Sequence, residues 1–162
     1  MSSLFTKRRI LLAVAVAALS GCATRSMPLP IADTIAASPQ LSTLNSLVAK
    51  AGLTDTLKSS GPFTVFAPTN EAFGKVPAKT METLAADPAK LKAVLTYHVI
   101  PGRVMAAEVK NGNAKTLNGA NVALSKAGEF VTIEDALVQT PDIAATNGVI
   151  HVIDSVLMPP AQ

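Results

Sequence analysis

Tryptophan is absent from this 162-residue chain, which has one tyrosine, five phenylalanines and one cysteine. Because aromatic side chains are so few, a folded core must be built mainly from aliphatic residues. A single cysteine cannot form an internal disulfide. The Walker loop, the G-x-G-x-x-G loop, the G-x-S-x-G elbow and the S-x-x-K pair are also missing from the sequence. Their absence removes the usual sequence signs of nucleotide binding and of nucleophilic catalysis.

The start of the chain has the pattern of a bacterial lipoprotein signal. Residues 7–9 are Lys-Arg-Arg, residues 10–19 are apolar but too few to span a bilayer, and Leu-Ser-Gly-Cys follows at 19–22. These last four residues resemble the lipobox, in which the cysteine is acylated and becomes the first residue of the mature chain. We therefore expect residues 1–21 to be a signal peptide for the Sec route and Cys22 to carry palmitate. An ordinary secretory signal with a chance cysteine is the alternative.

The residue after Cys22 is Ala23, not the aspartate that marks retention in the inner membrane. This favours an outer-membrane lipoprotein that faces the periplasm of a bacterial cell envelope. Removing residues 1–21 takes away three of the fourteen basic residues, so eleven basic side chains balance eleven acidic ones. A neutral domain without a basic stripe argues against nucleic-acid binding. We expect residues 22–31 to be the lipidated cysteine and a tether, and residues 32–160 to be one domain.

The first half of this domain has helical patterns around one strand. Ser38-Pro39 is a good helix start, the leucines that follow recur at helical spacing, and Gly52 is a suitable end. Further helices are expected over residues 53–59, from Thr69 through Phe73, over residues 79–86, and after the Asp87-Pro88 cap. Residues 63–67 are β-rich and apolar on both faces, which predicts a buried strand.

The second half has the pattern of a β meander. Asn118-Gly119 lies between two short apolar runs and predicts a hairpin. Gly128 and Glu134-Asp135 mark further turns. The apolar run over residues 149–158 predicts a central strand covered on both faces. Helices followed by strands, without regular alternation, predict an α+β domain built on antiparallel sheet.

Four segments together resemble the fasciclin-like domain: "TVFAPTNEAF", "LTYHVIPGRV", "KTLNG" and "NGVIHVIDSVLMPP". They occur in the order and at the spacing of that family, from about residue 32 to residue 160. The resemblance implies an α+β wedge in which two antiparallel β-sheets pack with a group of N-terminal helices. It also implies a role in adhesion or cell contact, here in a single-domain secreted bacterial member.

The resemblance implies two further features. The Tyr-His motif of the family falls on Tyr97-His98. In animal matrix members an Asp-Ile pair before the last motif is a candidate integrin contact, and Asp142-Ile143 occupies that place here. Asp142 and Ile143 are therefore a candidate adhesion contact. The alternative is structural, with Ile143 in the core and Asp142 shaping a turn.

The two histidines, His98 and His151, are the residues on which a catalytic or metal-binding interpretation would depend. Neither lies in a metal-binding spacing, and Cys22 is committed to lipid. Asp154 follows His151 by three residues, so on a strand the two side chains point to opposite faces. We therefore predict that Tyr97, His98, His151 and Asp154 are structural polar groups, with no metal, no cofactor and no catalytic residue.

These observations favour a non-enzymatic, envelope-anchored binding or adhesion module. Its expected partners are an envelope or host-surface protein and, through the lipid, the membrane. The alternative is a periplasmic carrier of a small apolar ligand, with methionines lining an adaptable groove.

Overall fold

The computed structural model describes residues 28–160, so the predicted signal peptide and Cys22 lie outside the described residues. The helical elements are α1 (Ile31–Ala37), the 3₁₀ turn η1 (Pro39–Leu41), α2 (Ser42–Lys50), α3 (Thr54–Lys58), α4 (Asn70–Lys75), α5 (Ala78–Ala86) and α6 (Pro88–Tyr97). The strands are β1 (Phe63–Pro68), β2 (Val99–Pro101), β3 (Gly112–Lys115), β4 (Asn121–Ala127), β5 (Phe130–Ile133), β6 (Ala136–Ala145) and β7 (Gly148–Ile153). Between residues 28 and 160, no helix is long and apolar enough to cross a membrane.

Local capping explains where several helices begin. The Thr69 hydroxyl accepts a hydrogen bond from the Ala72 N–H and starts α4, and the Asp87 carboxylate accepts from Ala89 and Lys90 and starts α6. Gly52, with a φ of 67°, follows α2. Both caps and this end were predicted from the sequence and are confirmed, whereas Ser38, the other predicted start, precedes η1 without a capping hydrogen bond from its side chain, and α2 begins only at Ser42.

Helix α1 was not predicted from the sequence. Ile31, which the sequence placed in the tether, is completely buried in the core. Its N–H donates to the Asn147 side-chain oxygen at 2.9 Å, so a residue 116 positions away fixes the start of the helix. The helix has only seven residues, which are too few to show a helical period, and its anchor is distant in the sequence.

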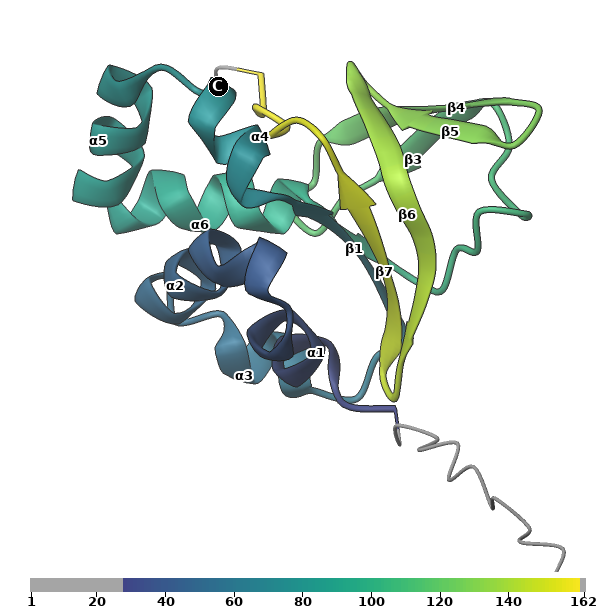
Figure 1. Ribbon diagram of the computed structural model, residues 1–162, viewed down its shortest axis with the longest axis horizontal. Coiled ribbons are helices and arrows are strands. Elements are labelled where there is room, and N and C mark those ends of the chain that lie inside the picture. The colour runs from purple at the N-terminus through teal and green to yellow at the C-terminus, as the bar shows by residue number, and fades with distance from the viewer. Residues whose placement is uncertain (1–27, 161–162) are drawn as a thin grey trace, which may run out of the picture.

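The seven strands follow the order β2-β1-β7-β6-β5-β4-β3 (Figure 1). All neighbours are antiparallel except β1 and β7, which run parallel from Phe63 opposite Gly148 to Pro68 opposite Ile153. The α+β fold class is confirmed. The resemblance implied two antiparallel sheets, whereas the strands form one seven-stranded order that includes a parallel pair. After β3 the Leu117 N–H donates to the Val99 carbonyl of β2 at 2.8 Å, so the chain at one end of the strand order meets the strand at the other.

This curved sheet separates two apolar cores. The helices gather on one side of β1 and β7 (Figure 1), where Leu41, Leu91 and Ile150 belong to one cluster. On the other side Phe66, Val122 and Ile153 belong to a second cluster, enclosed by the meander. Alternate residues of β1 and β7 therefore contribute to different cores.

Strand β7 is buried at every position, as the sequence predicted, but it ends at Ile153 and not near residue 158. Leu157 still packs in the cluster of Ile153, and Val156 packs against the cluster of Ile150. The apolar pattern past Ile153 thus reflects burial of an irregular segment. Strand β6, which follows the predicted turn at Glu134-Asp135, extends to Ala145.

Candidate functional site

His151 lies in the middle of β7 and is 1% exposed. Its Nε2 lies 2.8 Å from the Val104 carbonyl, which can only accept, and its Nδ1 lies 3.2 Å from the Asp142 N–H, which can only donate. These partners assign the proton to Nε2. Phe66 on β1 stacks on the ring with centroids 5.4 Å apart. Burial lowers the pKa of His151, although the Val104 carbonyl and the Asp142 charge act in the opposite direction.

Asp142 connects β6 to the loop after β2. The register of β6 against β7 shifts between Thr140 and Ile143, and Asp142 within this bulge has a φ of 56°. Its Oδ1 accepts a hydrogen bond from the Ala106 N–H at 2.8 Å. Ile143 is half-buried and packs against the core on the helical side. Asp142 and His151 are thus neighbours that jointly hold residues 104–106 beside the bulge.

Beside this bulge lies an open groove of about 500 Å³. Its lining includes Ala106, Phe130, Val138 and Pro141. The Phe130 side chain, at the start of β5, is 67% exposed. Strand β6 pairs with β5 only at Ala136 and Leu137, and beyond this pairing Val138, Gln139 and Pro141 border the groove. The lining also includes Lys126, Glu129 and Gln139, so the groove has mixed polarity and one exposed aromatic residue available for contact with another protein.

His98 lies at the end of α6 and belongs to a different set of contacts. Its Nδ1 lies 2.8 Å from the Val94 carbonyl, and its Nε2 accepts from the Leu157 N–H at 3.0 Å. The proton is therefore on Nδ1, the opposite tautomer to that of His151. Burial lowers the pKa of His98 to about 4, against a smaller opposing effect of Val94. His98 fixes the segment that follows β7.

Tyr97 and Asp154 each bind a separate part of the backbone. The Tyr97 hydroxyl donates to the Asn121 carbonyl at 3.2 Å, and burial together with the Glu134 charge raises its pKa. The Asp154 Oδ1 accepts from the Leu137 N–H at 2.9 Å, and this bond, with Lys75 nearby, lowers the pKa of Asp154. Across the described residues, histidine, cysteine, aspartate and glutamate side chains do not gather in groups of three that could hold a metal ion.

Comparisons with known proteins agree with this architecture. A sequence model of the family described as "Fasciclin domain" matches residues 39–159. The chain belongs to the fasciclin family. It is 42% identical over 146 residues to "Protein sll1483" of Synechocystis sp., covering 89% of this chain and 81% of that one.

Two mycobacterial fasciclin relatives are also similar. "Immunogenic protein MPB70" of Mycobacterium bovis is 39% identical, covering 82% of this chain and 70% of the relative. "Cell surface glycolipoprotein MPB83" of the same species is 38% identical, covering 82% of this chain and 62% of the relative. A FAS1 domain pair from the insect cell adhesion molecule Fasciclin I has the same fold, with a TM-score of 0.64 at 19% identity. That match covers 81% of this chain and 51% of the insect chain.

Sequence reasoning missed two polar residues that organise this fasciclin domain. Thr64 on β1 is fully buried, and its hydroxyl donates to the Gly102 carbonyl at 2.7 Å and accepts from the Val104 N–H at 2.8 Å. The sequence feature that could have revealed Thr64 is that it is the single polar residue in the apolar run "FTVFA".

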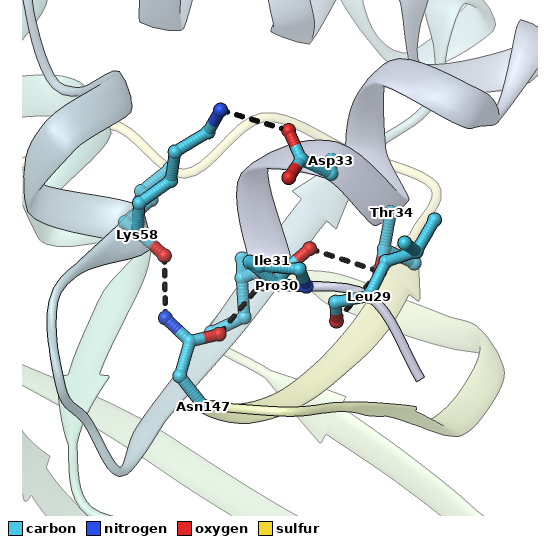
Figure 2. Close-up of polar contacts among 8 residues, drawn as sticks. Leu29, Pro30, Ile31, Asp33, Thr34, Lys58 and Asn147 are labelled. Atoms are coloured by element: carbon cyan, nitrogen blue, oxygen red, sulfur yellow. Dashed lines mark hydrogen bonds and ion pairs between the residues drawn. The ribbon is translucent and has the colours of Figure 1, made fainter. Parts of the chain in front are cut away.

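Asn147, in the turn between β6 and β7, is the second missed residue. Its side chain accepts from Ile31 of α1 and donates to the Leu57 and Ser59 carbonyls at 2.6 and 2.9 Å (Figure 2). It thereby joins three distant segments of the fasciclin domain at the point where the described chain begins. No local pattern signals this role.

Proposed function

We propose that this fasciclin domain is a non-enzymatic binding module, held at the bacterial cell envelope, that mediates adhesion through contacts with an envelope or host-surface protein. The observation that carries the proposal is the state of the two histidines. All four ring nitrogens of His98 and His151 are engaged with backbone groups. Burial lowers the pKa of both rings, so both are neutral near pH 7. Rings held in this way have no nitrogen available for proton exchange with a substrate.

The anchor in this proposal is acylated Cys22 in the outer membrane. A partner in the envelope can be reached from the periplasm, whereas attachment of cells to a host surface requires the domain to lie on the outer side of that membrane. The name of the relative MPB83, a cell surface glycolipoprotein, supports a surface location. The proposed contact surface is the groove beside Phe130 together with Asp142 and Ile143, which follow its lining residue Pro141 in the chain. An exposed aromatic residue in a groove that also offers polar and charged groups provides the kind of anchor on which protein contacts depend.

The test of the contact replaces Asp142 with asparagine. Alanine is unsuitable because it removes the acceptor for the Ala106 N–H and disfavours the positive φ. An asparagine side chain would keep the acceptor oxygen, tolerate that conformation and lose only the charge. Cells that carry Asp142→Asn should attach about fivefold less well than wild-type cells to the surface that carries the partner protein. The purified variant should melt at nearly the wild-type temperature.

Asp135→Asn is the matched control, because Asp135 is exposed in the turn between β5 and β6. It should leave attachment unchanged. Wild-type attachment by the Asp142→Asn cells would remove Asp142 from the contact. Equal attachment by cells that lack the whole protein would refute adhesion as the function.

The geometry does not favour the carrier of an apolar ligand. A partly enclosed apolar cavity between the helices and β1, lined by Ile35, Leu44 and Leu95 among others, has a volume of about 20 Å³, whereas the larger apolar hollow of about 420 Å³ beside Leu84, Val94 and Met158 is open to solvent. The volume of about 20 Å³ holds about one water molecule.

A further inference from the structure

A polar hollow of about 460 Å³ lies at the opposite border of the sheet from the Phe130 groove, next to the turn between β6 and β7. Its lining includes Lys58, Ser59, Ser60, Arg103, Thr146 and Asn147, and contains no carboxylate. Two cationic side chains and several hydroxyl groups around one hollow are suited to an anionic group such as a phosphate.

Arg103 is the side chain in this hollow whose charge is least compensated. Among residues 28–160 it has no ion-pair or hydrogen-bond partner, and it is exposed. Lys58, in contrast, pairs with Asp33 at 2.9 Å (Figure 2). The side-chain hydroxyls of Ser60 and Thr146 also lack partners within the described part of the chain, whereas the Ser59 hydroxyl donates to the Thr56 carbonyl. Arg103 and Thr146 are therefore the donors that we assign to a ligand, and the exposed Ser60 beside them is a position for a probe.

The hollow lies where the described chain begins. The Leu29 carbonyl accepts a hydrogen bond from the Thr146 N–H at 2.9 Å, and the Ile31 N–H donates to Asn147. The Leu29 side chain is 47% exposed, so an apolar side chain lies at the same edge. Figure 2 shows Leu29, Asn147 and Lys58 together at this corner.

Six residues lie between Cys22 and Leu29, and the seven steps from one to the other span at most about 25 Å. We propose that the hollow binds the phosphate of an anionic phospholipid in the membrane that anchors the chain, so that the corner around Asn147 faces the bilayer. This inference depends on the lipid anchor of the proposed function. A short tether keeps the hollow at high effective concentration near the headgroups, and the attraction of Arg103 acts within about 10 Å of them. The Phe130 groove then remains accessible to a protein partner.

The experiment uses the lipidated full-length protein in vesicles of phosphatidylcholine, with or without phosphatidylglycerol. Acylated Cys22 is not free to react, so a thiol introduced by Ser60→Cys is the only reactive one. Labelling of Ser60→Cys by a bulky, membrane-impermeant maleimide should be about fivefold slower on the anionic vesicles than on the neutral ones. Ser125→Cys, on the exposed face of β4, is the matched position and should react at the same rate on both.

Arg103→Gln in the Ser60→Cys protein should remove the protection on anionic vesicles. Lys79→Gln is the charge control, since Lys79 is exposed on α5, which lies at the other end of the helical layer in Figure 1, and it should leave the protection intact. Inorganic phosphate should not slow labelling of the detergent-solubilised protein.

The outcomes distinguish a headgroup site from a site for free phosphate and from the absence of a lipid anchor. Equal labelling of Ser60→Cys on both kinds of vesicle, with the protein attached, refutes the headgroup site and leaves the anchor intact. Protection by inorganic phosphate as strong as that by vesicles means that the hollow is a site for free phosphate, and the membrane assignment is wrong. A protein that incorporates no palmitate refutes the anchor and this inference with it.

Discussion

His98 makes the stability of the domain depend on pH. The Leu157 N–H donates to its Nε2, so a protonated ring would place two donors against each other. Burial lowers the pKa from 6.5 to about 4 in the folded chain, and the unfolded chain therefore takes up the proton first as the pH falls. The His98 contribution to the free energy of unfolding is fully present above pH 6.5 and is lost between pH 6.5 and about 4. Its size is on the order of 3 kcal/mol.

Urea titrations at a series of pH values measure this loss. His98→Gln lacks the titrating ring, so its free energy of unfolding should fall much less over the same range. A weaker dependence of the free energy of unfolding on pH should remain in this variant, because burial also lowers the pKa of His151. Asp154 and Asp87, whose pKa values are lowered below 3.8, lose their contribution at more acidic pH. The same dependence of the free energy of unfolding on pH in wild type and His98→Gln would contradict the role assigned to His98.

The residue types in these contacts could be predicted from the sequence, but their partners could not. The absence of metal-binding spacing around His98 and His151 predicted structural imidazoles, bonded to backbone or to a neighbouring hydroxyl. The partner of His98 at Nε2 is 59 residues away, and Asp142 reaches His151 across a bulge. Such partners follow from strand register and loop position, which no local pattern encodes.

At the scale of elements, the parallel pairing of β1 with β7 requires a glycine at its first step. A Cβ on Gly148 would collide with the Phe63 carbonyl and lie 2.8 Å from the Cδ1 of Ile31. Gly148→Ala should therefore force the two strands apart and lower the free energy of unfolding by about 3 kcal/mol. Chemical denaturation measures the change.

Gly74→Ala is the matched control for this substitution. Gly74 lies within α4, and a Cβ there would meet no atom within 4 Å. Since alanine favours a helix over glycine, Gly74→Ala should be neutral or stabilising by up to about 1 kcal/mol. Equal losses in both variants would show that the approach of β1 and β7 is not the cause.

Elements with local signals were predicted well. Thr69 and Asp87 cap their helices within three residues, and the turns at Gly119 and Gly128 need a positive φ, so short sequence windows carry the information. The parallel pairing joins segments at opposite ends of the domain, and an apolar strand fits either direction of pairing. The end of β7 was misplaced because Val156 and Leu157 are apolar for packing outside the sheet.

At the scale of the whole molecule, two cores share one pair of strands. Val65 and Ile150 face the helical core, whereas Phe66 and Ile153 face the core inside the meander. Loss of either core removes the support for one face of β1 and β7. The domain should therefore unfold in a single transition.

The single tyrosine provides a test of this coupling. Tyr97 packs in the meander core, and with no tryptophan in the chain its fluorescence reports on that core alone. Leu41→Ala removes a side chain that is 1% exposed in the helical core, and it should cost about 2 to 5 kcal/mol. The melting curves of Tyr97 fluorescence and of helical circular dichroism should shift together in this variant, and likewise in Val122→Ala, which truncates the other core. A Tyr97 transition that stays at the wild-type temperature in Leu41→Ala would mean that the cores unfold independently, because β1 and β7 would then hold the meander without the helices.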